Sequence, residues 1–128
     1  MRASILDLRQ KTRAQKKPVE NGKEFHLKYS CGGGMDIEFL TQYCLLMHAH
    51  RHPSLVDHTD VMRQIDGLLA HACLSPSQSH ALQDAWRHIR ALTHSCVLRM
   101  RPRVVPFAEV RSVVEQVRQV WRDMMHSQ

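Results

Sequence analysis

The chain has 128 residues, of which 43% are hydrophobic and 23% charged, and its formal net charge is +6. This length suits one domain, and the balance excludes a disordered or low-complexity chain. Aromatic residues make up only 5%, which favours an aliphatic helical core over a β-sandwich.

Positive charge is concentrated at the two ends of the chain. Residues 1–28 carry a net charge of +5 and residues 99–128 carry +3, whereas residues 29–98 carry −2. Lysine and arginine on helix surfaces explain this pattern. Nucleic-acid binding is the alternative, but no aromatic stacking set or Arg-Gly run supports it.

The sequence predicts a cytoplasmic protein without membrane association. It contains no apolar run of the length that a signal peptide or a membrane span requires. Its cysteines lie far apart, with no C-x-x-C spacing, which predicts reduced, mostly buried thiols. They are Cys31, Cys44, Cys73 and Cys96.

The chain is predicted to open with a helix over residues 1–17. Ser4 can serve as the N-cap, while Arg9 falls on a different face from the apolar positions. The residues of the expected inner face are Ile5, Leu8 and Thr12.

An extended, glycine-rich segment is predicted over residues 18–35. Pro18 ends the first helix, and Asn21-Gly22 favours a turn. Phe25 and Leu27 then alternate with polar residues, as they would in a short strand.

A helical bundle is predicted over residues 36–128, starting with Asp36 as an N-cap. The next helix has apolar residues on more than one face, which predicts a central, buried position, and Pro53 is expected to end it. Thr59-Asp60 and Ser75-Pro76 can start two further helices. Their expected inner residues are Met62, Ile65, Leu69 and Ala72, and then Leu82, Ala85, Ile89, Leu92 and Cys96.

The last helix gives the strongest periodic signal. It follows a linker between Pro102 and Pro106, and its apolar residues recur at steps of three and four. They are Phe107, Val110, Val114, Val117, Trp121 and Met124. Together these patterns predict one all-α domain, an antiparallel bundle of about five helices with a short extended, glycine-rich insertion after the first helix.

The glycine run before the second helix is the main candidate site. Exposed amides at a helix start can hold a phosphate, whereas a structural turn is the alternative reading. Asp36 could simply cap this helix, and Glu38 would benefit from the helix dipole. The candidate residues for contact with a phosphate or another domain are Gly32, Gly33, Gly34, Asp36 and Glu38.

A histidine tract gives no comparable signal for a metal. On a helix His48 and His52 share one face, but His50 points elsewhere, so three ligands do not converge. No catalytic group is assigned either, because no G-S followed by D-x-D, the motif that presents paired acids to Mg²⁺, occurs in the chain.

A longer set of motifs resembles one family. Residues 32–43, GGGMDIEFLTQY, resemble the G-G-x-x-D-I-E-F-x-x-Q-Y signature of glutamine synthetase adenylyltransferases. His48-Ala49-His50, Thr59-Asp60 with Arg63, and Ala85-Trp86 with Ile89-Arg90 resemble further elements of that family in the same order.

The resemblance implies a bifunctional parent enzyme. In that family one half transfers AMP from ATP to a tyrosine of glutamine synthetase with Mg²⁺, the other half removes it, and glutamine and the PII signalling protein control both. The chain would then be the helical C-terminal segment after the second nucleotidyltransferase domain. It would lack the catalytic acids, bind no cofactor itself and be inactive alone.

Two other classes of function remain open from the sequence. One is a stand-alone, non-catalytic module that binds glutamine synthetase or PII. The other is a basic helical nucleic-acid binder, which steep salt dependence of DNA or RNA retention would reveal.

Overall fold

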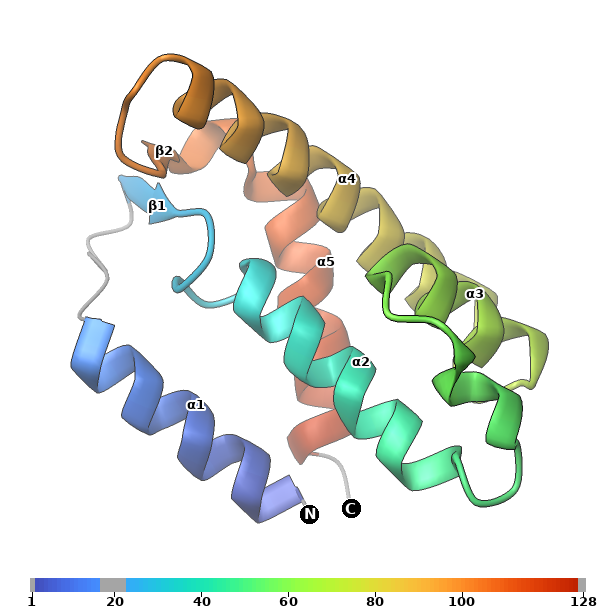
Figure 1. The fold of residues 1–128 in the computed structure, drawn as a ribbon. Coiled ribbons are helices and arrows are strands. Elements are labelled where there is room, and N and C mark those ends of the chain that lie inside the picture. The colour runs from blue at the N-terminus through green and yellow to red at the C-terminus, as the bar shows by residue number, and fades with distance from the viewer. Residues whose placement is uncertain (1, 17–22, 127–128) are drawn as a thin grey trace.

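A computed structural model describes residues 2–16 and 23–126 (Figure 1). In this part of the chain there are five α-helices and one two-stranded antiparallel sheet, so the prediction of a mostly helical bundle is confirmed. The elements are α1 (Arg2–Lys16), β1 (Glu24–His26), α2 (Gly34–His48), α3 (Val61–Ala70), α4 (Pro76–Leu98), β2 (Val104–Pro106) and α5 (Arg111–Trp121). Short 3₁₀ turns span Pro53–Asp57 and Phe107–Glu109, and a π-helical turn spans Arg122–His126.

Helix α2 is the centre of the bundle, as its broad apolar surface predicts. It packs against each of the other four helices, with α1 on one side of it and α4 on the other (Figure 1). Nine of its 15 residues are buried. None of the described helices is both long enough and apolar enough to cross a membrane.

Local capping signals define the starts of α3 and α4. Asp60 is the N-cap of α3, where its side chain accepts from the backbone N–H of Arg63. Ser75 forms a complete capping box with Gln78, and Pro76 occupies the first turn of α4. Both predicted starts are confirmed.

The inner faces of α4 and α5 largely agree with the periodicity. The residues buried at predicted positions are Leu82, Ala85, Ile89, Cys96, Val110, Val114, Val117 and Trp121. On α3 the predicted face is partly wrong: Ile65 and Leu68 are buried, whereas Leu69 is 37% exposed. Ala72 lies beyond the helix in a left-handed conformation, with φ of 58°.

The sheet joins two segments that are distant in the sequence. Phe25 pairs with Val105, and both side chains are buried. The backbone N–H of Leu27 extends the pairing by donating to the carbonyl of Arg103 at 2.9 Å. The sheet therefore fixes the chain before α2 beside the C-terminal end of α4 (Figure 1).

Two predicted helix boundaries and one predicted inner face are corrected by the structure. Ser4 lies inside α1, which starts at Arg2, so it is not the N-cap. The inner face of α1 is rotated from the predicted one, because Leu8 is 53% exposed while Arg9 turns inward. Helix α2 ends at His48, before the 3₁₀ turn that Pro53 begins. The predicted helix end at Pro18 and turn at Asn21-Gly22 lie outside the described residues.

Candidate functional site

The glycine run forms a tight turn against the start of α2. Gly32 has a φ of 85°, a left-handed conformation that favours glycine. A Cβ on Gly33 would lie 2.8 Å from the carbonyl oxygen of Leu27 and 3.0 Å from that of Ser30. Both distances are too short for backbone that cannot move aside, so this turn requires glycine for its close packing.

The amides of this turn donate within the chain. The N–H of Gly32 donates to Asp36 Oδ2 at 2.7 Å, and that of Gly33 to the carbonyl of Ser30 at 2.9 Å. The N–H of Gly34 donates to the carbonyl of Leu27 at 2.9 Å, and that of Met35 to Lys28 at 3.0 Å. In this conformation these amides are not available to a phosphate, and the geometry favours the structural reading of the glycines.

Asp36 is not the N-cap, because α2 starts at Gly34 with Gly33 in the capping position. Asp36 instead lies in the first turn, 1% exposed, and pairs with Arg9 of α1. Arg9 Nε donates to Oδ1 at 2.8 Å and Nη2 to Oδ2 at 2.7 Å, a bidentate geometry. Burial lowers the pKa of Arg9, but the hydrogen bonds and charge of Asp36 outweigh it, so the pKa is raised overall.

The same arginine connects the turn to α5. Its guanidinium carbon lies 4.1 Å from the centroid of the Trp121 ring, a cation–π contact, and Nη2 lies 3.4 Å from Cys31 Sγ. Arg118 of α5 donates through Nε to the carbonyl of Cys31 at 2.9 Å. These four residues, with Asp36, hold α1, the glycine turn and α5 in one fixed arrangement.

Glu38 is separate from this cluster. It is exposed and lines a pocket of about 110 Å³ together with Gly34, at the side of α2 that faces Trp86 and Arg90 of α4. The structure therefore divides the predicted candidates between a buried turn, which contains Gly32, Gly33 and Asp36, and a surface pocket. No pattern in the sequence indicates that α4 contributes to this pocket.

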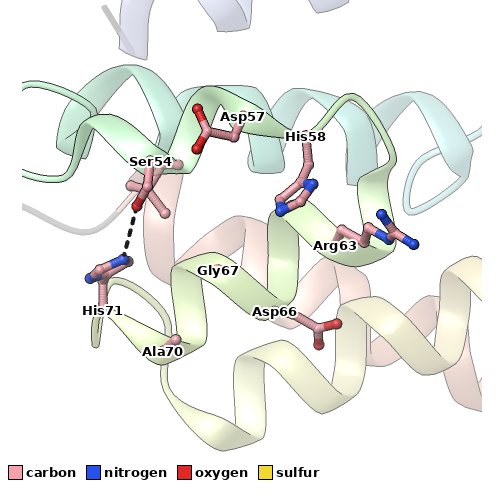
Figure 2. Close-up of a pocket in the computed structure, with 9 residues that line it drawn as sticks. Ser54, Asp57, His58, Arg63, Asp66, Gly67, Ala70 and His71 are labelled. Carbon is pink, nitrogen blue, oxygen red and sulfur yellow. Dashed lines mark hydrogen bonds between the residues drawn. The ribbon is translucent and has the colours of Figure 1, made fainter.

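A second pocket lies between the Pro53–Asp57 turn and α3 (Figure 2). Its volume is about 470 Å³, and its walls carry charges of both signs, among them Asp57 and Arg63, with His58 between them in the sequence. Ser54 Oγ and His71 Nε2 lie 3.5 Å apart across one end. Asp66 Oδ1 accepts a hydrogen bond from Gln83 at 2.7 Å, so it is tied to α4.

The histidine tract is split by the end of α2. His48 is its last residue, and the ring of His52 stacks on that of His71, with centroids 4.3 Å apart. Among residues 2–16 and 23–126, no three His, Cys, Asp or Glu side chains are grouped so that they could hold a metal ion. With the amides of the glycine turn also occupied, the described residues do not fit Mg²⁺ or the phosphates of ATP at this turn.

Comparison with known proteins gives consistent matches. A family model described as GlnD PII-uridylyltransferase matches residues 1–103. Bifunctional glutamine synthetase adenylyltransferase/adenylyl-removing enzymes of Mannheimia haemolytica and Thioalkalivibrio sulfidiphilus are each 32% identical over 125 residues, which cover 98% of the chain. The corresponding enzyme of Xanthobacter autotrophicus is 38% identical over 102 residues, or 80% of the chain. The chain spans 13% or less of the length of these three relatives.

Proposed function

Because the chain belongs to the family described as GlnD PII-uridylyltransferase, we propose that it is the helical part of a bifunctional glutamine synthetase adenylyltransferase/adenylyl-removing enzyme. The observation that carries this proposal is similarity to such enzymes along 98% of the chain. That extent favours a parent enzyme acting on glutamine synthetase over one that uridylylates PII. The family resemblance inferred from the sequence is confirmed by these matches.

Within this enzyme the chain has a supporting or docking role. The motif that would present paired acids to Mg²⁺ does not occur in its sequence, so the reaction of ATP belongs to a nucleotidyltransferase domain of the same enzyme. The chain would pack on that domain or dock glutamine synthetase, and PII would act as a regulator. The proposed location of the parent enzyme and its partners is the cytoplasm.

The ion pair between Arg9 and Asp36 supports this role physically. It joins α1 to the first turn of α2, and Arg118 joins the same turn to α5. A surface built on rigid helices presents its contact residues with little entropy to lose on binding. The chain would therefore offer a preorganised surface to its partner.

A stand-alone interaction module is the second candidate. The chain has a core of its own, with Leu27, Ile37 and Leu40 fully buried together with Ile65 and Leu82. A folded core allows the chain to bind glutamine synthetase or PII without an attached enzyme.

Biolayer interferometry with the purified chain tests the docking role. The surfaces would carry glutamine synthetase, PII, or the Mannheimia haemolytica enzyme from which the matching 125 residues have been removed. We expect binding to glutamine synthetase or to the truncated enzyme. Binding to PII alone would favour the stand-alone module, and no binding to any of the three would contradict the proposal.

A further inference from the structure

A small basic pocket lies where the first turn of α2 meets the middle of α4 and the segment before β2. Its volume is about 110 Å³, and three cations from three different segments line it: Lys28, Arg90 and Arg103. Glu38 is the acidic residue of the lining. The Trp86 side chain forms part of its wall close to Gly34, because a Cβ on that glycine would lie 3.8 Å from Trp86 Cζ3.

The positive charge of this pocket is not neutralised by ion pairs. Among the described residues, no carboxylate oxygen lies within 4.0 Å of the charged nitrogens of Lys28, Arg90 or Arg103, whereas Arg9 and Lys11 each have such a partner elsewhere in the fold. Arg90 lies over the Trp86 ring with its guanidinium carbon 5.9 Å from the centroid. That contact orients the guanidinium but leaves its charge available to a partner.

The lowered pKa of a neighbouring histidine is consistent with the same positive charge. His26 lies on β1, two residues before Lys28, and its pKa is lowered by burial and by the charges of Arg103 and Lys28. Lys28 and Arg103 therefore act together on one region of the surface, as they would on a bound anion.

Exposed apolar side chains continue from this pocket along α4. Trp86, Arg90, Thr93 and Val97 follow one another at steps of three and four, so they share one helical face. Val97 is 52% exposed, and Leu98 in the next position is 70% exposed. Aromatic and arginine side chains beside exposed apolar residues are typical of protein-binding surfaces.

We propose that this surface, defined by Lys28, Trp86, Arg90, Val97 and Arg103 and called the basic groove, docks an acidic peptide segment of a partner protein. Carboxylates of the segment would lie at the three cations, and an apolar side chain would pack on Val97. Glu38 can accept a hydrogen bond from a peptide N–H of the segment. A free phosphate would use the cations but not the apolar border.

This inference rests on the proposed docking role, but a probe without a named partner tests it separately. Fluorescence anisotropy would measure the binding of the chain to fluorescein-labelled decaglutamate, with decaglutamine as the uncharged probe. We expect binding to decaglutamate that weakens as salt is raised, because salt screens the charges, and no binding to decaglutamine.

Variants locate the binding. Arg90→Glu and Arg103→Glu should each weaken decaglutamate binding about tenfold, because each replaces an attractive charge by a repulsive one. Arg51→Glu is the matched control, since it changes the net charge equally but lies beyond the opposite end of α2. Arg90→Gln and Arg103→Gln remove the positive charge without reversing it and should weaken binding less. Circular dichroism checks that each variant folds.

The inference is overturned if Arg51→Glu weakens binding as much as Arg90→Glu does. It is also overturned if duplex DNA, inorganic phosphate or phosphatidylserine vesicles bind the groove while decaglutamate does not. The same variants, measured against glutamine synthetase and the truncated enzyme, separate the two proposals. If the chain binds decaglutamate but neither protein partner, the proposed function is contradicted and the basic groove is not. If a protein partner binds and these variants leave its binding unchanged, the basic groove is contradicted and the proposed function is not.

Discussion

The guanidinium of Arg9 and the carboxylate of Asp36 meet in a bidentate ion pair across 27 residues of sequence, at 2.7 and 2.8 Å. Asp36 also accepts from the amide of Gly32, so one carboxylate serves both the neighbouring helix and the turn. Helix α1 has no fully buried residue. Its attachment to the bundle therefore combines this ion pair, the bond from Arg2 Nε to the Tyr43 hydroxyl at 2.9 Å, and the packing of the half-buried Ile5 and Leu6 on the core.

Removing the carboxylate should destabilise the fold well beyond the loss of a helix cap. Asp36→Ala leaves the largely buried Arg9 unpaired and the Gly32 amide without its acceptor, so we expect a loss of about 3 kcal/mol in the free energy of unfolding. Asp36→Asn should cost less, because its amide oxygen can still accept from Gly32. Urea unfolding followed by circular dichroism measures both.

Asp7→Ala is the matched control, since Asp7 pairs with Lys11 on the same helix but is 63% exposed. It should change the free energy of unfolding by less than about 0.5 kcal/mol. Asp36→Ala at a similarly small cost would show that the ion pair does not hold α1 in place.

Adding one methyl group to the glycine turn should lower the stability of the fold, whereas the same change at a glycine inside α3 should not. Gly33→Ala places a Cβ 2.8 Å from the Leu27 carbonyl oxygen, which belongs to backbone already engaged in hydrogen bonds, so we expect a loss of about 2 kcal/mol or more. Gly67→Ala is the control inside α3, where the nearest atom is Leu55 Cδ2 at 3.4 Å, and helix propensity favours alanine. Equal melting temperatures for the two variants would contradict the close packing of the turn.

His26 should make stability depend on pH. Its Nδ1 accepts from the amides of Lys28 and Tyr29, each at 3.2 Å, and burial together with Arg103 and Lys28 lowers its pKa below 6.5. Above pH 6.5 this contribution to stability is fully present. As the pH falls, the unfolded chain takes up the proton first, so the contribution is lost progressively down to the folded-state pKa.

An NMR titration of the His26 ring checks this directly. Arg103→Gln should raise the pKa of His26 toward its ordinary value, because it removes one of the positive charges that lower it. Arg51→Glu should leave the titration of His26 unchanged. A pKa of His26 that does not respond to Arg103→Gln would place the two side chains farther apart than the structure has them.

The four cysteines should differ strongly in reactivity. Burial, with a smaller contribution from Cys73, raises the pKa of the Cys44 thiol to about 12, so almost no thiolate exists at pH 8. Cys31 is only half-buried, and we expect Ellman's reagent to modify it in the folded chain while Cys44 reacts only after denaturation. Mass spectrometry of the labelled peptides gives the order. Labelling of Cys44 as fast as that of Cys31 under native conditions would contradict its burial.

Features that depend on neighbours in the sequence could be predicted, and those that depend on distant segments could not. Asp60 and Ser75 signal helix starts because an N-cap binds amides only two or three residues ahead. The face of α5 was predictable because its apolar residues repeat without interruption. The short strand at Phe25 could be predicted from its alternation, but its pairing with Val105 could not, because Val105 lies in a segment that reads as a linker and no local pattern indicates the partner strand.

The candidate site shows the same division. The order of residues in the sequence was enough to identify the glycine turn and Asp36 as candidates. The predicted role of Asp36, an N-cap, was wrong, and Arg9 was placed on an outer face of its helix. In α1 the charged Arg9 points inward because it pairs with the buried carboxylate of Asp36 on α2. No pattern within α1 indicates that partner. The basic groove could not be predicted either, because Lys28, Arg90 and Arg103 come together only after α4 and the sheet have packed.

The most direct test of the account is the rate at which AMP is transferred to glutamine synthetase by a chimeric enzyme. This chain would replace the matching 125 residues of the Mannheimia haemolytica enzyme, and the same enzyme with those residues deleted would be the reference. With labelled ATP, we expect the chimera to transfer AMP measurably faster than the deletion, while the isolated chain transfers none. A folded chimera that is no faster than the deletion, or transfer by the isolated chain, would contradict the proposal that this chain is a supporting module of an adenylyltransferase.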